Sequence, residues 1–439
     1  MKNVLIVTRF FPPFSNGGIF RVHAFVKYLP ENNWCPVVLT VKEEYSPKNQ
    51  QDYTLLKDYH PKVKIVRTHS LEPHTGYFLK LRDQVTGVKK TTPWFESFTK
   101  PVLRWVFRTI AIPDEHILWL PHAVKAGVKA VKENNIDLIF VSSPPHSAAI
   151  IAALISKISK IPLIWDVRDD WVGNPYYTDN NPWLYRFLSH FQEKKLVQTA
   201  QTVVTVTSES IESFEKKYPR QPKTKFQLIR NGYDAKETLA AQTGLPSRTC
   251  KKLRIIYTGI LPAKRNPSAF FQALLDINHE RPLRDIIQVD FYGSIRQDFV
   301  DLANLMGLQG IVNFMGQVPR IESIRQIVNA DIGLIIIPEE EGSQTAIPGK
   351  LYEYVGAQKI VMALCPQDSA CARLIQAKKL GISISNNDVT AIKKTLYSFL
   401  DDHARGKLTT LYQPENLVEF ERANQTQILS VILESATRK

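Results

Sequence analysis

The chain has 439 residues, of which 44% are hydrophobic and 22% are charged, and its formal net charge at pH 7 is +14. This length predicts two or three domains, and the composition is that of a globular protein, which argues against a disordered chain. The positive charge fits anionic partners of any kind, among them nucleic acid, acidic lipid and phosphorylated substrates. Charge alone does not choose among these partners.

The cysteines and the apolar runs indicate a cytoplasmic protein. The four cysteines form neither a C-x-x-C pair nor a short disulfide framework, which favours free thiols in a reducing compartment. The apolar run at residues 4–7 is too short for a signal peptide. Since no 18 apolar residues follow one another, we expect no transmembrane helix.

The first half of the chain predicts a parallel sheet. Residues 4–7 are typical of a buried strand, and a Pro/Gly loop and a helix at about residues 19–29 follow. Short apolar runs that alternate with helical segments indicate βαβ units and a parallel sheet. Further strands of this half are predicted at residues 36–41, 138–141, 163–166 and 202–207.

The loop after the first strand ends in two glycines, Gly17 and Gly18, at the predicted helix start. Glycines at this place let the backbone approach a ligand closely and leave N–H groups free for an anion. The loop does not fit the pattern G-x-G-x-x-G, so a dinucleotide-binding fingerprint is not supported. A plain turn is the structural alternative.

Residues 78–110 form a basic and aromatic insertion. Seven lysines and arginines stand here against Asp83 and Glu96, with tryptophans and phenylalanines between them. Such a segment can lie in a membrane interface, with its cations toward anionic headgroups. A helical hairpin that covers the first domain is the structural alternative. Single-stranded nucleic acid could use the same chemistry, but the chain contains no recognisable nucleic-acid module.

Two further strands of the first half lead into candidate catalytic residues. His146 follows the strand at 138–141, where a histidine can hydrogen-bond a substrate hydroxyl or relay a proton. Arg168 and Asp169 lie between two tryptophans after the strand at 163–166, and charges there are expected to be paired or functional. A structural histidine and a structural Arg–Asp ion pair are the alternatives.

A polar stretch at residues 240–252 marks the predicted domain boundary, with domains at residues 1–240 and 241–413. The βαβ pattern restarts there with a strand at 253–257 and a helix at 268–277. Two doubly wound domains that face one another leave a cleft at the carboxyl ends of both sheets. A C-terminal helical segment at 414–439 can return to the first domain. Further strands are predicted at residues 288–292, 312–315, 332–337 and 360–363.

The loop after the first strand of the second half carries Gly259, Lys264 and Arg265. Arginine makes paired hydrogen bonds to phosphate oxygens, and lysine acts as a point charge. The loop therefore suits a diphosphate, although a solvated loop is the structural alternative. Both cations share the carboxyl edge of their predicted sheet with Lys350, and this convergence favours function.

Residues 348–357 contain the most informative pair, Lys350 and Glu353, at a predicted helix start after the strand at 332–337. A lysine there can meet a phosphate, helped by free N–H groups and the helix dipole. The glutamate lies one turn on, on the same face, and can accept hydrogen bonds from sugar hydroxyls. The pair suits a nucleotide-sugar.

Phosphate-binding P-loops and metal sites fit the sequence poorly. Six residues separate Gly342 from Gly349, and Leu351 stands where a P-loop needs Ser or Thr, so an NTPase is rejected. The three glutamates at 339–341 favour a solvated loop, since consecutive carboxylates cannot all face one ion. No D-x-D occurs in the chain, which argues against a metal-dependent sugar transferase.

Five segments, in order along nearly the whole chain, resemble motifs of glycosyltransferase family 4, a family of retaining enzymes with the GT-B fold. The donor signature of the family is matched by Lys350 and Glu353, which by resemblance would lie near the diphosphate and hold the ribose hydroxyls. Thr345 stands where many members have a second glutamate near the donor sugar. The other four segments are Pro12-Pro13 with Gly17-Gly18 and Arg21, the D-x-R-D-x-W element at 166–171, the element Asn231-Gly232-Tyr233-Asp234, and residues 257–259 with 264–267.

The resemblance implies an α/β protein of GT-B type, with two doubly wound Rossmann-like domains that face a central cleft. It also implies retaining, metal-independent transfer of a sugar from a UDP- or GDP-linked donor to an acceptor hydroxyl, with no cofactor. Lys264, Arg265 and backbone N–H groups would stabilise the departing diphosphate, and His146 with the Arg168/Asp169 pair would lie near the reacting carbon. The donor site would also include Gly17, Gly18, Gly259, Thr345, Lys350 and Glu353.

The motif at 166–171 resembles an element of the bacterial surface-polysaccharide branch of the family. A lipid-linked saccharide or an oligosaccharide is then the expected acceptor, at an anionic inner membrane face, and nucleic acid is not expected as a partner. A nucleotide-sugar 2-epimerase shares the two-domain plan and is the enzymatic alternative. An inactive scaffold that binds a sugar nucleotide or a membrane is the non-enzymatic one.

Overall fold

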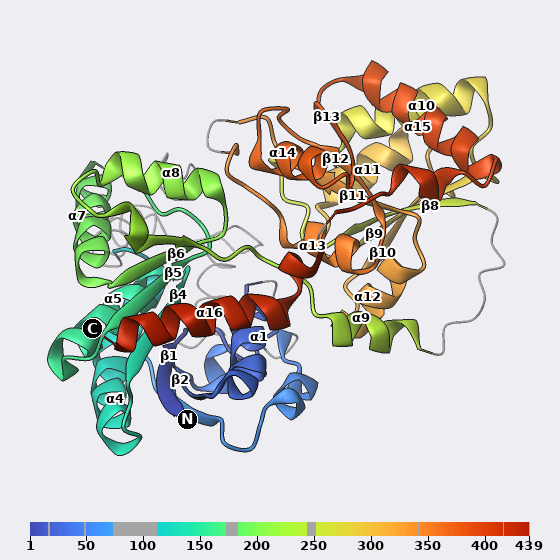
Figure 1. Cartoon of the computed structure of the whole chain (residues 1–439). Coiled ribbons are helices and arrows are strands. Elements are labelled where there is room, and N and C mark those ends of the chain that lie inside the picture. Colours follow the sequence, from blue (N-terminus) through green and yellow to red (C-terminus); the bar gives the residue numbers. More distant parts are fainter. Residues whose placement is uncertain are drawn as a thin grey trace, which may run out of the picture. The chain divides into compact units, whose positions relative to one another are not determined.

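The computed structural model describes residues 1–15, 18–47, 50–72, 112–172, 183–243, 252–340, 343–415 and 417–438. The chain forms two compact units (Figure 1). Unit 1 comprises Met1–Arg230 with Thr426–Lys439, and unit 2 comprises Asn231–Gln425. Each unit contains one parallel sheet with helices on both faces, which confirms the predicted α/β class and the two doubly wound sheets. Within the described ranges, no helix has the length and apolar character needed to cross a membrane.

The sheet of unit 1 consists of β1 (Lys2–Val7), β2 (Trp34–Val41), β3 (Lys64–Thr68), β4 (Leu138–Ser143), β5 (Leu163–Val167), β6 (Thr202–Thr205) and β7 (Phe226–Leu228). The strand order is β3-β2-β1-β4-β5-β6-β7, and all neighbouring strands are parallel. The chain order reverses between β1 and β4. Ligands bind beside such a switch point, at the carboxyl ends of the strands, in doubly wound folds.

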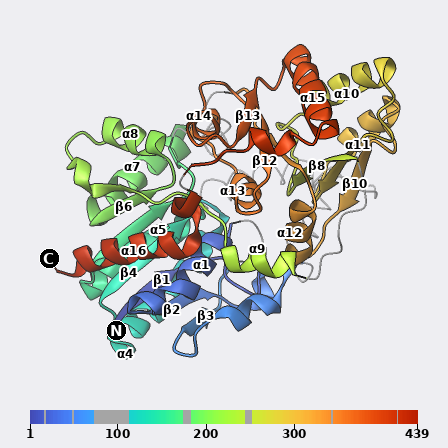
Figure 2. The same ribbon diagram turned by 45° about the vertical axis from the view of Figure 1, so that its right-hand side comes forward.

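The helices associated with unit 1 are α1 (Phe20–Tyr28), α4 (Leu120–Glu133), α5 (His146–Ser159), α7 (Trp183–Thr199), α8 (Ser208–Lys217) and α16 (Arg422–Thr437), of which α16 enters the unit at Thr426. Successive side chains of a strand point to opposite faces of the sheet. Val4 and Ile6 therefore pack against α1 and α16, whereas Leu5 and Val7 pack on the face covered by α4, α5, α7 and α8. Both views show α1 beside α16 (Figures 1 and 2).

The sheet of unit 2 consists of β8 (Leu253–Thr258), β9 (Ile287–Tyr292), β10 (Val312–Gly316), β11 (Ile332–Ile336), β12 (Ile360–Leu364) and β13 (Gly381–Ile384). The order is β10-β9-β8-β11-β12-β13, again with parallel neighbours. The switch point lies between β8 and β11. Lys350 and the loop after β8 belong to this edge of the sheet.

The helices of unit 2 are α9 (Ala235–Gln242), α10 (Ser268–Glu280), α11 (Gln297–Leu305), α12 (Arg320–Val328), α13 (Gly349–Gly356), α14 (Ala370–Ala377) and α15 (Val389–Ala404). One face of the sheet packs against α10, α11 and α15, and the other against α12, α13 and α14. Short 3-10 helices lie at Leu29–Asn32, Glu43–Tyr45, Tyr53–Asp58, Glu115–Trp119, Lys223–Lys225, Leu408–Leu411 and Leu417–Phe420.

The two units divide between Arg230 and Asn231, some ten residues before the stretch at 240–252 that the sequence indicated. The difference arises from α9, which the sequence analysis assigned to the first domain. Glu237 on this helix pairs with Arg320 at 2.7 Å, so that α9 packs with α12 in unit 2. The predicted boundary at residue 240 thus falls within unit 2.

Candidate functional site

The carboxyl ends of β8 and β9 approach one another through two glycines. Gly259 directly follows β8 with a φ of 99°, and Gly293 directly follows β9 with a φ of 123°, values that favour glycine. A Cβ atom on Gly293 would lie 2.2 Å from the carbonyl oxygen of Gly259. A Cβ atom on Gly259 would in turn lie 3.7 Å from Nζ of Lys350. Glycine therefore keeps the backbone after β8 close to the lysine.

Lys350, the second residue of α13, places its ammonium against an aromatic ring. Its Nζ lies 3.2 Å from the ring centroid of Tyr257, is shielded from solvent, and finds no hydrogen-bond partner within the described part of the chain. Burial and the nearby charge of Arg265 hold the pKa of Lys350 well below its usual value, although Glu353 opposes this shift. A bound anion would stabilise the charged ammonium and raise this pKa.

Arg265 lies at the same place, and Lys264 does not join it. The guanidinium of Arg265 lies 3.5 Å from the carbonyl oxygen of Ile260, which also accepts a hydrogen bond from Tyr257, and its positive charge lowers the pKa of Lys350. Lys264 instead donates to Glu340 at 2.7 Å, in an ion pair whose side chains are 45% and 43% exposed. Of the basic residues predicted for the donor site, the structure thus gathers Arg265 and Lys350 and leaves Lys264 in a surface ion pair.

Glu353, one turn after Lys350 on α13, is held by an arginine that the sequence analysis did not single out. Arg320, the first residue of α12, contacts Oε1 of Glu353 at 2.8 Å and Oε2 of Glu237 at 2.7 Å. Burial would lower the pKa of Arg320, but attraction to the two carboxylates outweighs burial and raises it. Arg320 therefore carries a buried positive charge that fixes the orientation of Glu353.

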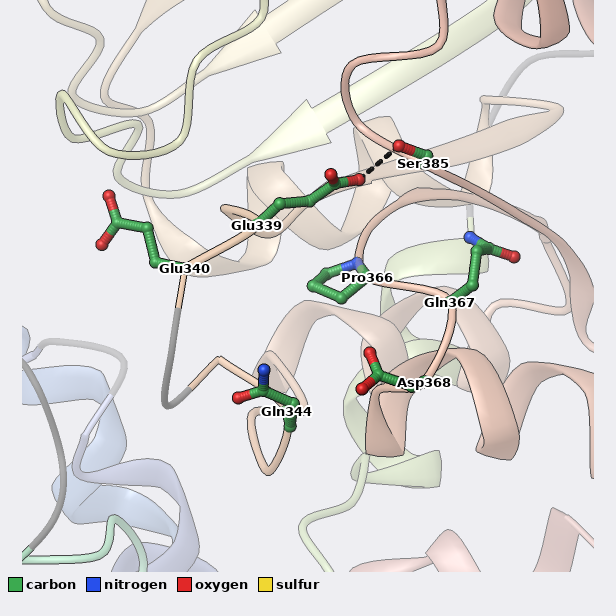
Figure 3. Close-up of a pocket in the computed structure, with 7 residues that line it drawn as sticks. All are labelled: Glu339, Glu340, Gln344, Pro366, Gln367, Asp368 and Ser385. Carbon is green, nitrogen blue, oxygen red and sulfur yellow. Dashed lines mark hydrogen bonds between the residues drawn. The ribbon is translucent and has the colours of Figure 1, made fainter.

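A polar cavity of about 430 Å³ lies at the carboxyl ends of β11, β12 and β13. Glu339 is tied into its wall, because it accepts hydrogen bonds from the Ser385 hydroxyl and from the backbone N–H of Asn386 at 2.8 Å. Glu339, which was expected to lie in a solvated loop, is therefore held in place by these contacts. Figure 3 shows Gln344 and Asp368 at the side of the cavity away from Glu339. The lining residues are Glu339, Glu340, Gln344, Pro366, Gln367, Asp368 and Ser385.

Thr345 is half-buried in the turn between β11 and α13, next in sequence to the cavity residue Gln344. Within the described part of unit 2, no hydrogen bond links it to Lys350 or Glu353. Thr345 thus follows a residue of the polar cavity in sequence without lining it, and no hydrogen bond joins it to the basic cluster within the described residues.

In unit 1, the three predicted catalytic residues have different surroundings. His146 is the first residue of α5, is buried, and stacks on Trp171 with ring centroids 4.5 Å apart and planes 6° apart. Burial, together with the charge of Arg168, lowers the pKa of His146 to about 3. The imidazole is therefore neutral at physiological pH, where it can exchange hydrogen bonds with a hydroxyl but carries no extra proton.

Arg168 links the loops at the carboxyl ends of β1 and β4. Its guanidinium donates hydrogen bonds to the carbonyl oxygens of Gly18 and Pro144, while Asp169 is exposed. Arg168 thus orders the glycine loop and the loop that leads to His146. The predicted donor residue Gly17 lies outside the described residues, as does the insertion at 78–110.

The buried ion pair of the D-x-R-D-x-W element involves its first aspartate. Asp166 accepts hydrogen bonds from Arg21 at 2.7 Å and from the Ser142 hydroxyl at 2.7 Å. Arg21 also donates to the carbonyl oxygen of Arg230 at 2.7 Å. These contacts join α1 to β4 and β5. They also tie α1 to Arg230, the last residue of the first of the two segments that form unit 1. Because the Arg21–Asp166 ion pair lies in the core, we interpret its role as structural.

A second buried charge at the carboxyl end of β1 was not predicted. Arg9, which is 2% exposed, donates to Glu72 at 2.7 Å, and His116 lies 3.1 Å from the same carboxylate. Burial would raise the pKa of Glu72, but hydrogen bonds to His116 and Arg9 lower it to about 2. The sequence offers one signal for this group: an arginine two positions after a buried strand needs a counter-ion.

Comparisons of the sequence give one family and no individual relative. The profile of a family described as Glycosyltransferase Family 4 matches residues 17–237, which is half of the chain. No curated protein matches the sequence.

Several solved structures resemble the whole chain. The structure of Anabaena Alr3699/HepE in complex with UDP has a TM-score of 0.64 and 14% sequence identity, and covers 99% of this chain and 100% of its own. Sucrose-phosphate synthase from Thermosynechococcus elongatus has a TM-score of 0.66 at 13% identity, with 99% of both chains covered. UDP-GlcNAc 2-epimerase from Neisseria meningitidis, bound to UDP-GlcNAc, has a TM-score of 0.60 at 11% identity, covering 99% of this chain and 100% of its own. At these identities the likeness concerns the fold.

Proposed function

The chain belongs to glycosyltransferase family 4 and has the GT-B fold, and from this premise we propose the details of its reaction. It transfers a sugar from a nucleoside-diphosphate donor to an acceptor hydroxyl, without a metal ion and with retention of configuration at the sugar carbon. The basic cluster of unit 2 receives the diphosphate. The observation that carries the proposal is the buried ammonium of Lys350, which has no hydrogen-bond partner in the described chain and lies beside a second cation.

Two chemical features favour a diphosphate as the anion. Lys350 stands in the first turn of α13, where the helix dipole and backbone N–H groups also favour negative charge. The guanidinium of Arg265 adds donors that match phosphate oxygens. Charge develops on the departing diphosphate in the transition state, so cations fixed at this place lower the barrier most.

The ribose of the donor is proposed to bind Glu353. Arg320 contacts Oε1 of this carboxylate, and within the described residues no donor contacts Oε2. A carboxylate whose orientation is fixed through one oxygen can accept hydrogen bonds from vicinal hydroxyls through the other. Glu353 also lies one helical turn from Lys350, on the same face, which suits neighbouring ribose and phosphate groups.

The donor sugar is proposed to lie toward the polar cavity after β11. Its carboxylate and amide side chains offer acceptors for sugar hydroxyls, and its volume of about 430 Å³ falls within the range of small-molecule sites. Thr345, adjacent to the cavity residue Gln344, is the chain's candidate for the donor-sugar contact. The carboxylates of the cavity repel phosphate and so favour one orientation of the donor.

The proposed step makes one bond and breaks one. The acceptor oxygen forms a bond to the sugar carbon, the bond from that carbon to the diphosphate oxygen breaks, and the acceptor proton passes to the leaving diphosphate. His146 remains neutral and orients a hydroxyl through hydrogen bonds. Arg168 fixes the loops around this histidine.

The acceptor is proposed to be a lipid-linked saccharide in cell-surface polysaccharide synthesis, at the inner face of the membrane. The net charge of +14 supports an anionic surface as a partner. The motif at 166–171 supports the polysaccharide branch of the family.

Calorimetry with UDP and GDP tests the donor site. We expect one nucleotide to bind with uptake of a proton at neutral to mildly alkaline pH, because the phosphates raise the depressed pKa of Lys350. Titrations in buffers of different ionisation enthalpy measure this uptake. Lys350→Met should abolish the uptake and weaken binding by about tenfold or more, as expected for a lost charge-assisted hydrogen bond.

The matched control is Lys393→Met, which removes a lysine that pairs with Glu280 at 2.6 Å elsewhere in unit 2. This variant should bind like the wild type. If neither nucleotide binds, or if Lys350→Met binds as tightly as the wild type, the diphosphate site is wrongly placed.

Epimerisation is the second candidate, because the epimerase from Neisseria meningitidis has a similar fold. Incubation of the enzyme with a panel of UDP-, GDP- and ADP-sugars, with and without acceptor lipids, separates the two activities. Conversion of the donor in the absence of acceptor supports the epimerase. Transfer to acceptor with the donor's anomeric configuration, read by NMR, supports the proposed reaction, and binding without either reaction indicates a scaffold.

A further inference from the structure

Helix α7 presents a row of aromatic side chains to solvent. Trp183, Phe187 and Phe191 are 72%, 62% and 52% exposed, and their spacing of four places them on one face of the helix. α7 lies beside α8 on the outside of unit 1 in both views (Figures 1 and 2). Three exposed aromatic rings on one face of a helix form an apolar surface patch, which indicates a site of contact with a membrane or another protein.

The opposite face of α7 belongs to the core and fixes the helix in place. Tyr185 donates to the carbonyl oxygen of Pro113 at 2.6 Å, and Leu196 and Val197 are buried against the sheet. Glu193, the single carboxylate of the helix, is also on this side, where it accepts a hydrogen bond from Tyr218 at 2.6 Å. The aromatic row therefore takes no part in the packing of the described residues of unit 1.

The exposed face is positively charged around the aromatic rings. Arg186, Lys194 and Lys195 are exposed, and Nζ of Lys195 lies 5.6 Å from the ring centroid of Phe191. Since Glu193 points inward, this face of α7 carries no carboxylate. Cations beside aromatic rings match a surface with anionic groups above an apolar layer.

We propose that the exposed face of α7 binds an anionic lipid bilayer, with Trp183, Phe187 and Phe191 in the headgroup region and the basic side chains at the lipid phosphates. A second copy of the chain fits less well, because a two-fold interface brings the same face together and would set these cations against one another. The contact would hold the enzyme where a lipid-linked acceptor lies. The role of this contact in reaching the acceptor rests on the proposed function. Binding of α7 to a bilayer can be measured without donor or acceptor.

Co-sedimentation with vesicles tests the proposal. The wild type should bind vesicles of phosphatidylcholine with about 30% phosphatidylglycerol much more tightly than pure phosphatidylcholine. The triple variant Trp183→Ala, Phe187→Ala, Phe191→Ala should lose at least about tenfold in binding, because apolar area no longer leaves water. Neutralising Arg186, Lys194 and Lys195 with glutamine should cost about fivefold per charge on the anionic vesicles.

The matched control replaces three exposed apolar side chains outside α7, namely Tyr53→Ala, Leu239→Ala and Leu305→Ala, which are 55%, 66% and 86% exposed. It should bind vesicles like the wild type. Brominated lipids should quench the wild type more than Trp183→Phe, since Trp183 would lie in the bilayer interface.

Vesicle binding that is absent in the wild type, or unchanged in the triple alanine variant, overturns the assignment to α7. A dimer that dissociates in this variant, without vesicle binding, would instead make α7 an interface between copies, and tight binding to oligonucleotides alone would assign it to nucleic acid. Nucleotide binding by unit 2, measured in the same samples, shows separately whether the proposed donor site stands.

Discussion

The ammonium of Lys350 lies in surroundings that disfavour its positive charge. It lies 3.2 Å from the ring centroid of Tyr257 and close to Arg265, with its pKa well below the usual value. A buried polar group without a partner costs about 1–3 kcal/mol, and in the proposed donor site a bound phosphate would remove this cost.

His146 gives a prediction for the dependence of stability on pH. Its pKa is about 3 in the folded chain and 6.5 in the ordinary state, so the unfolded chain binds a proton more readily between these values. This contribution to stability is complete above pH 6.5 and is lost as the pH falls toward 3. At about pH 5 the loss is about 2 kcal/mol, and His146→Phe, which keeps a ring beside Trp171, should not show it.

The measurement is urea unfolding at about pH 7.5 and about pH 5, followed by tryptophan fluorescence. All seven tryptophans lie at or before position 183, so the signal reports on unit 1. His146→Gln is the control for packing, because it removes the same titrating group with a different shape. Equal sensitivity to pH in the wild type and both variants would contradict the prediction.

At the scale of elements, three helices of unit 2 meet at one guanidinium. Arg320 on α12 pairs with Glu237 on α9 and with Glu353 on α13. Its charge is buried, and Arg422 of the C-terminal segment lies near enough that burial and repulsion by Arg320 lower the pKa of Arg422 to about 10. A positive charge in this position orients Glu353 and lies close to the start of α16.

Arg320→Ala should therefore weaken nucleotide binding by about tenfold or more, since a charged partner of Glu353 is lost. The effect should depend on the ribose: the wild type should prefer UDP or GDP over the 2′-deoxy form, and the variant should lose most of this preference. Calorimetry with both forms measures it. Loss of stability alone would weaken binding of both forms equally.

Arg325→Ala is the matched control, because Arg325 lies on the same helix, is 42% exposed and pairs with Glu322 at 3.7 Å. This variant should keep both the affinity and the preference for ribose. A wild-type preference in Arg320→Ala would show that Glu353 is oriented without Arg320.

At the scale of the whole molecule, the two ends of the chain belong to one unit. The chain enters unit 2 at Asn231 and returns to unit 1 at Thr426. In unit 1, Leu429 and Leu433 of α16 are fully buried on the face of the sheet formed by Val4 and Ile6. The N-terminal strand is thus covered by the last helix of the chain.

Leu433→Ala should destabilise unit 1 by about 2–5 kcal/mol, because it leaves a cavity in this core. Unfolding followed by tryptophan fluorescence measures the change. Val431→Ala, on the same helix and 64% exposed, should change stability by no more than about 0.5 kcal/mol. An effect of Leu433→Ala no greater than that of Val431→Ala would mean that α16 contributes little to unit 1.

The sequence pattern located the central strands of both sheets but missed β3, β7 and β13. All three lie at sheet edges, and most of their residues are half-buried. An edge strand does not need the continuous apolar run that a central parallel strand shows. Pattern alone therefore detects central strands reliably, whereas of the four edge strands it detected β10 and missed the other three.

Among the site residues, the outcome depended on the distance in sequence between partners. The sequence pointed to Lys350 and Glu353 because they lie one turn apart on one helix, and their role in the donor site stays a prediction. Arg320 was missed because its partner Glu353 lies 33 positions away, and Lys264 was expected at the diphosphate but pairs with Glu340, 76 positions away. Which distant residue a charged side chain pairs with is decided only when the folded chain brings the two residues together.

The sequence by itself determined the two parallel sheets, the family, and the lysine and glutamate at the start of α13, because each of these depends on local spacing. The tertiary structure decided which charges pair, which pKa values move, and that an aromatic row on α7 faces solvent. The physical reason is that burial and long-range electrostatics depend on what surrounds a residue after folding. Spacing along the chain does not carry that information.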